Sequence, residues 1–237
     1  MSRVNNRKNV FIESVITNAV PTRDVSNNIY KYSLTFNVIA TETWYVIYKN
    51  SARLLSAFNF QQWIIESDFP GHEKLEYLFD GLEDNRNGFT TATNNGIQHY
   101  YKNEDIASVA DLVRKRTNEL LTEQESPIIA GELDKAWTIT YNPGGWQALH
   151  SHAYRYNIIS TVIYFDTNEN ENTSDGAFYA VFSEPDGEQI VQVCPYWAGK
   201  FLVMEGAIQH GAYPTTSTRR CLIIDFKQET HDNTDTK

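Results

Sequence analysis

Two histidines, His150 and His152, stand on either side of a serine, shortly after the glycine pair Gly144-Gly145. Side chains two residues apart in a strand point to the same face, so these imidazoles could share one metal ion. The spacing is equally typical of two polar side chains on a solvent-facing strand edge, and most such pairs bind no metal. On its own, the pair is therefore a weak signal of a metal site.

A third histidine, His210, strengthens the case for a metal. It follows the apolar run 201–204 and the turn Glu205-Gly206, where a late strand would begin. Three histidines from two distant segments can occupy one face of an octahedral ion and leave the opposite face open for substrates. The three histidines are therefore our candidate metal ligands.

Arg219 stands just before the last apolar run, residues 221–226. A guanidinium that enters a packed strand needs an anionic partner, because burying it unpaired is costly. A carboxylate suits it well, since its two oxygens can accept two parallel hydrogen bonds. The sequence thus predicts an arginine that binds an acid near the metal.

The second half of the chain reads as a series of short strands. Apolar or alternating runs, each followed by Gly, Pro, Asn or Asp, predict a meander of about seven strands. They cover residues 137–141, 146–152, 157–165, 177–182, 190–193, 200–204 and 221–226. Their density and regular spacing favour a jelly-roll sandwich or barrel.

The first half is expected to support that core. Residues 30–36 alternate and predict an early strand, while residues 51–66 look helical. A longer helix is predicted from residue 103 or 104 to residue 122, with Glu104 and Asp105 in its first turn. We therefore expect an α+β, mainly β, fold: a double-stranded β-helix, or jelly roll, with supporting N-terminal helices.

The expected organisation is a single domain over residues 1–230. Supporting strands and helices would fill residues 1–135, the jelly-roll core residues 136–227, and a disordered tail residues 231–237.

Composition excludes some classes of function. The 237 residues carry a formal net charge of -10 without a long basic cluster, which makes general nucleic-acid binding or membrane-surface binding unlikely. No run approaches the ~20 apolar residues of a membrane span, and no signal peptide is apparent, so we expect a soluble, cytoplasmic protein. The two cysteines, Cys194 and Cys221, fit reduced thiols. The oligomeric state is left open.

The order of these motifs resembles the Fe(II)- and 2-oxoglutarate-dependent oxygenases, closest to their prolyl-hydroxylase-like branch and to uncharacterised bacterial and phage members. The resemblance covers roughly residues 137–227, and its most specific element is the nine-residue step from His210 to Arg219. The motifs are Tyr141-Asn-Pro-Gly-Gly, His150-x-His152, Ile163-Tyr164-Phe165, Asp175-Gly-Ala-Phe, Gly199-Lys-Phe-Leu-Val, His210-Gly-Ala-Tyr-Pro and Arg219.

The resemblance implies a hydroxylase that releases succinate and CO2. Fe(II) would be held by the three candidate histidines, 2-oxoglutarate would be the cosubstrate and O2 the oxidant, with ascorbate as a candidate reductant. Arg219 would bind the distal carboxylate of 2-oxoglutarate, with Tyr141 and Tyr164 as further contacts. An aromatic residue in a strand is more often a core residue than a ligand contact, so these two tyrosines are the weaker assignments. The substrate would be a small molecule or a peptide.

One position departs from the family pattern. The usual first pair is His-x-Asp, part of a 2-His-1-carboxylate triad, whereas this chain has His152 where the acid would stand. Some uncharacterised members carry His-x-His, so we interpret the change as a variant. A neutral third imidazole leaves the metal one negative charge poorer, and no nearby acid clearly substitutes, because Asp166 lies at the far end of the next strand.

Two other interpretations stay open at this point. A cupin-type metal-binding protein also uses His-x-His and a later histidine, but usually has a glutamate a few residues after the pair, where this chain has Arg155, Tyr156 and Asn157. A metal-free jelly-roll module that binds a protein or glycan would leave the spacing of His210 and Arg219 to chance.

Overall fold

The computed structural model describes residues 22–24, 29–32, 45–46, 52–57, 62–86, 93–152, 157–169, 174–183 and 189–230. These residues form strands, one α-helix (α2, Asn103–Glu123) and one 3-10 helix (η1, His72–Phe79). The strands are β1 (Thr22–Asp24), β2 (Ile29–Tyr32), β3 (Tyr45–Val46), β4 (Ala52–Ala57), β5 (Gln62–Asp68), β6 (Thr93–Tyr101), β7 (Ile128–His150), β8 (Ile158–Tyr164), β9 (Phe178–Ser183), β10 (Gln189–Cys194), β11 (Lys200–Glu205), β12 (Gln209–Ala212) and β13 (Arg219–Thr230).

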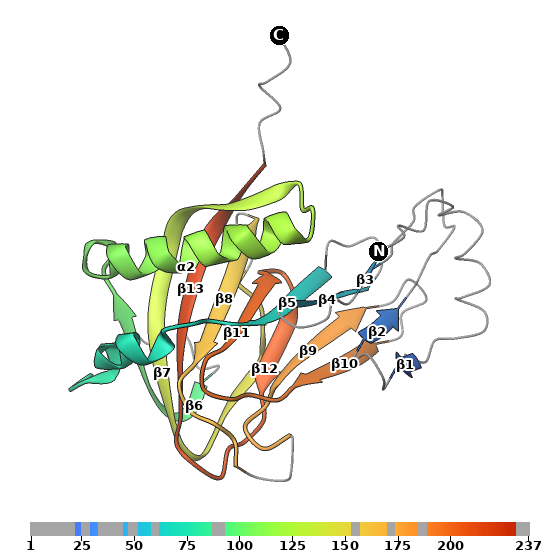
Figure 1. The fold of residues 1–237 in the computed structure, drawn as a ribbon. Coiled ribbons are helices and arrows are strands. Elements are labelled where there is room, and N and C mark those ends of the chain that lie inside the picture. The colour runs from blue at the N-terminus through green and yellow to red at the C-terminus, as the bar shows by residue number, and fades with distance from the viewer. Residues whose placement is uncertain are drawn as a thin grey trace, which may run out of the picture.

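Most of the strands belong to one curled antiparallel sheet, which forms the jelly-roll core (Figure 1). Its order is β10-β9-β12-β7-β13-β8-β11-β5-β4, and β6 lies off this path and also pairs with β7. Strands distant in sequence are thus neighbours: β13 lies between β7 and β8, and β12 between β9 and β7. The predicted jelly roll is confirmed, but the strands do not follow one another as a simple meander.

Both faces of the central strands are buried, which explains their continuous apolar sequences. On β13, Cys221 and Ile223 face an inner core, while Leu222 and Ile224 face an outer core beneath α2. The same alternation runs along β8 and β11, in which every residue is buried. This period of two decides which side chains can reach the interior of the curled sheet.

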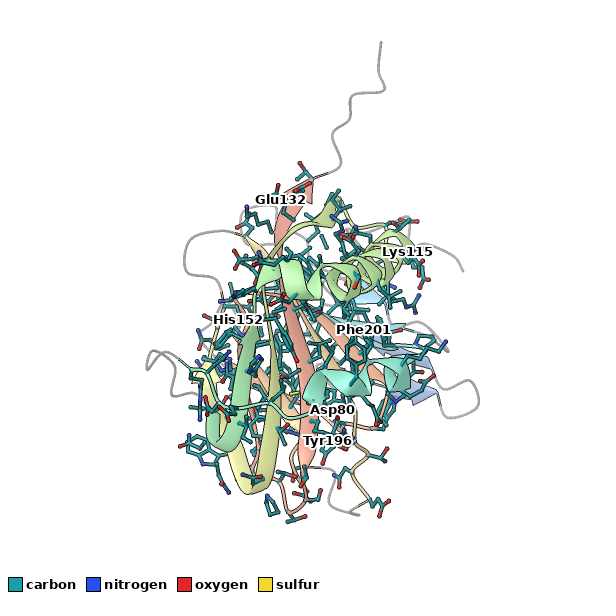
Figure 2. The ribbon with its side chains drawn as sticks, turned by 90° about the vertical axis from the view of Figure 1, so that its left-hand side faces the viewer. Asp80, Lys115, Glu132, His152, Tyr196 and Phe201 are labelled. Atoms are coloured by element: carbon teal, nitrogen blue, oxygen red, sulfur yellow. The ribbon has the colours of Figure 1, made fainter. Side chains whose placement is uncertain are left out.

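Helix α2 lies across the outer face of the sheet, over β7 and β13 (Figure 1). Its buried side chains pack into the outer core together with Phe201 of β11, while Lys115 points to the solvent side of the helix (Figure 2). The buried positions follow helical spacing: Ile106, Val109, Ala110, Val113, Thr117, Leu120 and Leu121. The helix predicted from residue 103 or 104 to residue 122 is therefore confirmed.

The helix predicted over residues 51–66 is wrong. The structure has β4 and β5 there, paired with each other, and β5 also pairs with β11. The adjacent residues Ile64 and Ile65 are both buried, one in the inner core and one in the outer core. A strand sends neighbouring side chains to opposite faces, so tertiary packing on both sides favours a strand over a helix here.

The two strands predicted at residues 137–141 and 146–152 form one longer strand, β7, which ends at His150. The two glycines between them are part of this strand. Gly144 adopts a positive φ of 84°, and its N–H donates to the Thr215 carbonyl at 2.6 Å. The early strand predicted at residues 30–36 overlaps β2, and its last four residues lie outside the described residues, as does the tail 231–237.

Among the described helices, none combines the length and the apolar content that crossing a bilayer requires.

Candidate metal centre

The structure brings the three candidate histidines together. His150 at the end of β7 lies directly opposite His210 on β12 in the strand register. His152 follows two residues after His150, and its backbone N–H donates to the Gly206 carbonyl at 2.7 Å. One ligand nitrogen from each ring can be chosen so that all three lie within 4.8 Å of one another. Of the three histidines, Figure 2 labels His152.

The outer nitrogen of each ring is held by the protein. His150 Nδ1 lies 2.8 Å from the Ala148 carbonyl, and His210 Nδ1 lies 2.8 Å from the Ile208 carbonyl. A carbonyl oxygen can only accept, so both Nδ1 atoms carry the proton and both Nε2 atoms keep a free lone pair. Such hydrogen bonds orient the histidine ligands of metal sites.

The inner nitrogens converge. His150 Nε2 and His152 Nε2 lie 3.2 Å apart. Two imidazole nitrogens at this distance can both coordinate one metal ion. The donor set, three imidazoles with their Nδ1 atoms engaged elsewhere, therefore fits a divalent transition metal.

Burial keeps two of these imidazoles neutral. Desolvation by burial, and to a smaller extent the neighbouring His152, lowers the pKa of His150 to about 4. Desolvation also lowers the pKa of His210 well below its usual value. Both rings are therefore uncharged at neutral pH, with the proton on Nδ1 and a lone pair on Nε2, which is the form that binds metal.

One cavity inside the curled sheet joins the histidines to the other predicted site residues. The three histidines, Arg219, Tyr141 and Tyr164 all line it. Most of the remaining wall consists of apolar or aromatic side chains: Trp137, Ile139, Val162, Phe178, Ala212, Cys221 and Ile223. The metal-binding groups and the cationic group thus share a mostly apolar pocket, as small-molecule sites generally do.

Arg219 is a buried cation with unused donors. Its side chain is only 1% exposed, and its Nε and Nη1 atoms have no hydrogen-bond partner within the described part of the chain. Its Cζ lies 4.0 Å from the centre of the Tyr141 ring, a cation–π contact that offsets part of the desolvation cost. Donors buried in this way favour an anionic ligand in the cavity.

The neighbouring Arg220 points to the other face of β13, as strand alternation predicts. It pairs with Asp166, whose Oδ1 lies 2.9 Å from Arg220 Nη2. The hydrogen bonds that Arg220 donates to the Asp166 carboxylate raise the pKa of Arg220. The acid considered as a substitute ligand is therefore engaged by Arg220, on the opposite face from Arg219.

Tyr141 and Tyr164 are both buried beside Arg219. Tyr141 lies opposite Arg219 in the β7–β13 register, and Tyr164 lies opposite Cys221 in the β8–β13 register. Burial raises the pKa of both phenols above the usual range. Each hydroxyl therefore stays protonated and can donate a hydrogen bond to a carboxylate.

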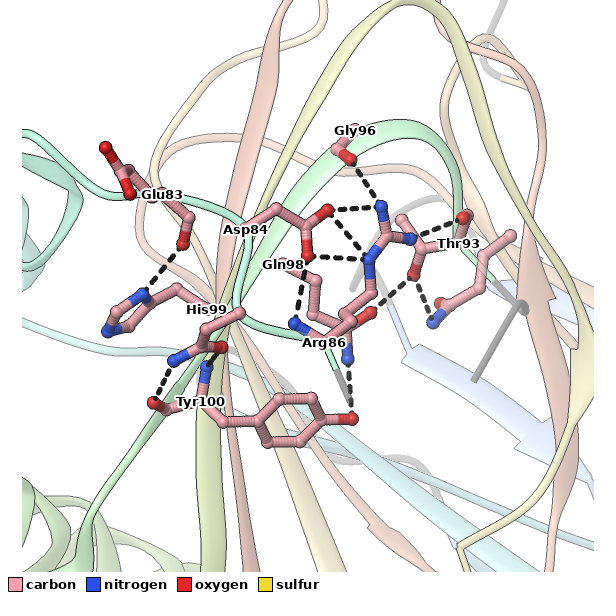
Figure 3. Close-up of polar contacts among 10 residues, drawn as sticks. Glu83, Asp84, Arg86, Thr93, Gly96, Gln98, His99 and Tyr100 are labelled. Carbon is pink, nitrogen blue, oxygen red and sulfur yellow. Dashed lines mark hydrogen bonds and ion pairs between the residues drawn. The ribbon is translucent and has the colours of Figure 1, made fainter. Parts of the chain in front are cut away.

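Gln147, which the sequence did not single out, also lines the cavity. Its Nε2 lies 3.4 Å from Thr93 Oγ1, which in turn donates to Gln98 Oε1 at 3.0 Å. Arg86 braces this part of β6 by pairing with Asp84 and donating to the Thr93 carbonyl (Figure 3). A polar network on β6 thus supports one wall of the pocket.

A second residue that the sequence analysis missed is Asp225. Its carboxylate is fully buried, and Oδ1 lies 3.0 Å from His152 Nδ1. Strand alternation offered a signal, because residues 219, 221, 223 and 225 share the inner face of β13. The contact joins residues 73 positions apart in sequence, so local spacing could not indicate it.

The fold is similar to those of solved oxygenase structures. No protein-family profile matches the sequence, and no curated protein matches it. An oxidoreductase of the 2OG-Fe(II) oxygenase family from Burkholderia pseudomallei is similar with a TM-score of 0.52 and 13% identity, covering 69% of this chain and 84% of that chain.

Two further structures are similar over a comparable length. A prolyl hydroxylase from Trichoplax adhaerens, in complex with a hypoxia inducible factor peptide fragment, has a TM-score of 0.45 and 12% identity over 66% of this chain and 74% of that chain. A Pseudomonas putida prolyl-4-hydroxylase has a TM-score of 0.42 and 16% identity over 59% of this chain and 74% of that chain. At these identities the likeness concerns the fold alone, and the fold of this chain is similar to that of the Burkholderia oxygenase.

Proposed function

We propose that the protein is an Fe(II)- and 2-oxoglutarate-dependent oxygenase that hydroxylates its substrate and releases succinate and CO2. The observation that carries this proposal is one cavity lined both by three converging imidazoles and by a buried arginine with unused donors. A metal alone would not require the arginine, and an acid alone would not require the histidines.

In this proposal, His150, His152 and His210 hold iron through their Nε2 atoms. Bound iron would supply the oxidation of a C–H bond by O2, coupled to decarboxylation of 2-oxoglutarate. The hydrogen bonds at Nδ1 keep the lone pairs of His150 and His210 directed at the metal.

Arg219 would bind the distal carboxylate of 2-oxoglutarate through two hydrogen bonds. The protonated hydroxyls of Tyr141 and Tyr164 would donate further hydrogen bonds to that carboxylate. The apolar wall, which includes Val162 and Ile223, would limit water and strengthen these electrostatic contacts.

The substrate is proposed to be a small molecule or a peptide, because the net charge of -10 disfavours a long nucleic acid. We also propose that residues 1–230 form one oxygenase domain. Cys194 and Cys221 are buried and not joined in a disulfide, which is compatible with the reducing cytoplasm that we expect for the protein.

The proposal is tested by measuring 2-oxoglutarate binding to purified protein with and without Fe(II), in the presence of ascorbate. We expect binding that depends on the metal, together with slow release of succinate in the absence of substrate. If 2-oxoglutarate does not bind to the metal-loaded protein, the proposal is wrong.

Two variants separate the parts of the site. His210→Ala should abolish metal binding, and with it the metal-dependent binding of 2-oxoglutarate. Arg219→Met should keep the metal but weaken 2-oxoglutarate binding by about 30-fold or more, because a buried charge pair is lost. A metal site whose ligand binding is indifferent to Arg219 would instead support a cupin-type protein.

A further inference from the structure

Asp225 lies behind the candidate metal centre, on the opposite edge of the His152 ring from Nε2. Its Oδ1 is 3.0 Å from His152 Nδ1, and Ser160 Oγ is 2.9 Å from the same nitrogen. Asp225 on β13 and Ser160 on β8 are partners in the strand register, so two neighbouring strands present both groups to one imidazole.

The carboxylate of Asp225 lies in a position that lowers the stability of the fold. It is fully buried, and its Oδ2 has no hydrogen-bond partner among the described residues. The cation paired with it is Lys135, whose Nζ is 3.7 Å from Oδ2 and whose side chain is 41% exposed. A buried, incompletely paired charge destabilises a fold, so an acid at this position is better explained by the site than by stability.

Asp225 also decides which nitrogen of His152 carries the proton. The hydroxyl of Ser160 can donate or accept, so by itself it leaves both tautomers open. An ionised carboxylate only accepts, and it would repel a bare Nδ1 at 3.0 Å. Asp225 therefore holds the proton on Nδ1 and leaves the Nε2 lone pair facing His150, 3.2 Å away.

We propose that Asp225 is the positioning residue of this metal centre and supplies, through His152, the negative charge that a three-histidine ligand set lacks. The inference rests on the proposed function only in that the three histidines hold a metal. The carboxylate that usually binds such a metal directly would here stand one imidazole further out, as the acceptor of a hydrogen bond from the ligand.

The first test is titration of the metal-free protein with Co(II), without 2-oxoglutarate. Asp225→Asn should raise the Kd for Co(II) by about 10- to 100-fold, because loss of a carboxylate partner of a histidine ligand has effects of that size. The visible absorption bands of bound Co(II) should shift as well, since the ligand is less basic and less well oriented.

Asp166→Asn is the matched control. Asp166 is also a carboxylate paired with β13, but it binds Arg220 on the other face of the strand. This variant should lower the melting temperature without changing Co(II) affinity. If Asp225→Asn binds Co(II) as the unaltered protein does, or if both variants weaken binding equally, the proposal is wrong.

A double-mutant cycle separates positioning from general stability. His152→Asp provides a carboxylate ligand directly, so in this background Asp225→Asn should no longer weaken Co(II) binding, and the relief of charge repulsion should strengthen it. An equal loss of affinity in both backgrounds would show that Asp225 has only a structural role.

The tautomer of His152 can also be measured in the unaltered protein, so that this test does not depend on the folding of a variant. In the Zn(II)-loaded protein, nitrogen NMR should show His152 protonated at Nδ1 and unprotonated at Nε2. A His152 protonated at Nε2, or a protein that binds neither Co(II) nor Zn(II), would overturn the proposal. Failure of 2-oxoglutarate to bind would overturn the oxygenase function alone, because none of these readouts uses the cosubstrate.

Discussion

The guanidinium of Arg219 is buried, with 1% of the residue exposed, and burying an incompletely paired charge costs stability. Two of its nitrogens, Nε and Nη1, have no hydrogen-bond partner in the described structure, and the Tyr141 ring makes a cation–π contact with it. An interaction of this kind recovers about 0.5 to 2 kcal/mol, less than the cost of burying an unpaired charge. Arg219 therefore lowers the stability of the unliganded fold but allows the cavity to bind an anion.

Arg219→Met should accordingly separate stability from ligand binding. In the absence of ligands, the free energy of unfolding should stay unchanged or rise by about 1 kcal/mol, since an apolar side chain of similar size replaces an unpaired charge. The measurement is urea unfolding of the metal-free protein, alongside the 2-oxoglutarate titration. A loss of several kcal/mol would mean instead that Arg219 is a structural residue.

At the level of elements, the short strand β12 positions one of the three candidate metal ligands. It carries His210 and is held between β9 and β7, with His210 opposite His150. Gly211 makes this pairing possible, because an added Cβ would lie 2.7 Å from the Gln147 carbonyl oxygen and 2.5 Å from Tyr179 Oη. The backbone oxygen cannot move aside without moving β7.

Gly211→Ala should therefore push β12 away from β7 and separate His210 from His150. We expect a loss of about 1 to 3 kcal/mol in the free energy of unfolding, as for other overpacked sites, and a weaker affinity for Co(II). Thermal unfolding and metal titration check the two effects. Val191→Ala on β10, where the side chain is 52% exposed, is the control and should change neither.

On the scale of the whole molecule, the curled sheet buries the histidines in an interior that disfavours their charged forms. The metal-free protein should therefore lose stability as the pH falls. The pKa of His150 is about 4 in the folded state, below its ordinary value of 6.5, and that of His210 is also lowered. Between these pH values the unfolded chain binds protons that the folded chain does not.

The expected profile follows from that difference. The contribution of His150 to the free energy of unfolding should be complete above about pH 6.5 and should fall by up to about 1.4 kcal/mol per pH unit towards pH 4. Urea unfolding at pH 7, 6 and 5 in the presence of a chelator measures the slope. His150→Gln should flatten it, and an equal slope in both proteins would contradict the assignment.

How far the sequence predicted the fold can be judged from particular elements. The helix at residues 103–123 was predictable because its apolar residues follow a local period and acids occupy its first turn. The region 51–66 was not, because Ile64 and Ile65 are buried on opposite faces only once β5 pairs with β11. Local propensity is a weak guide where packing on two sides determines the structure.

The same difference applies to the site. The sequence predicted the site residues His150, His152, His210 and Arg219. That prediction depends on residue type, on the period of two within a strand and on the resemblance to a known family. The sequence could not predict Asp225 as a partner of His152. Their contact depends on β13 lying beside β8 and across from the end of β7.

The amino-acid sequence therefore determined the candidate donors, the alternation of the strands and the jelly-roll class, since all of these depend on local periodicity and composition. Tertiary structure alone determined that β12 places His210 opposite His150, that Arg219 is buried with unused donors, and that an acid stands behind His152. The physical reason is that strand order and register are set by burial and hydrogen bonding between segments far apart in the chain, which local spacing does not encode.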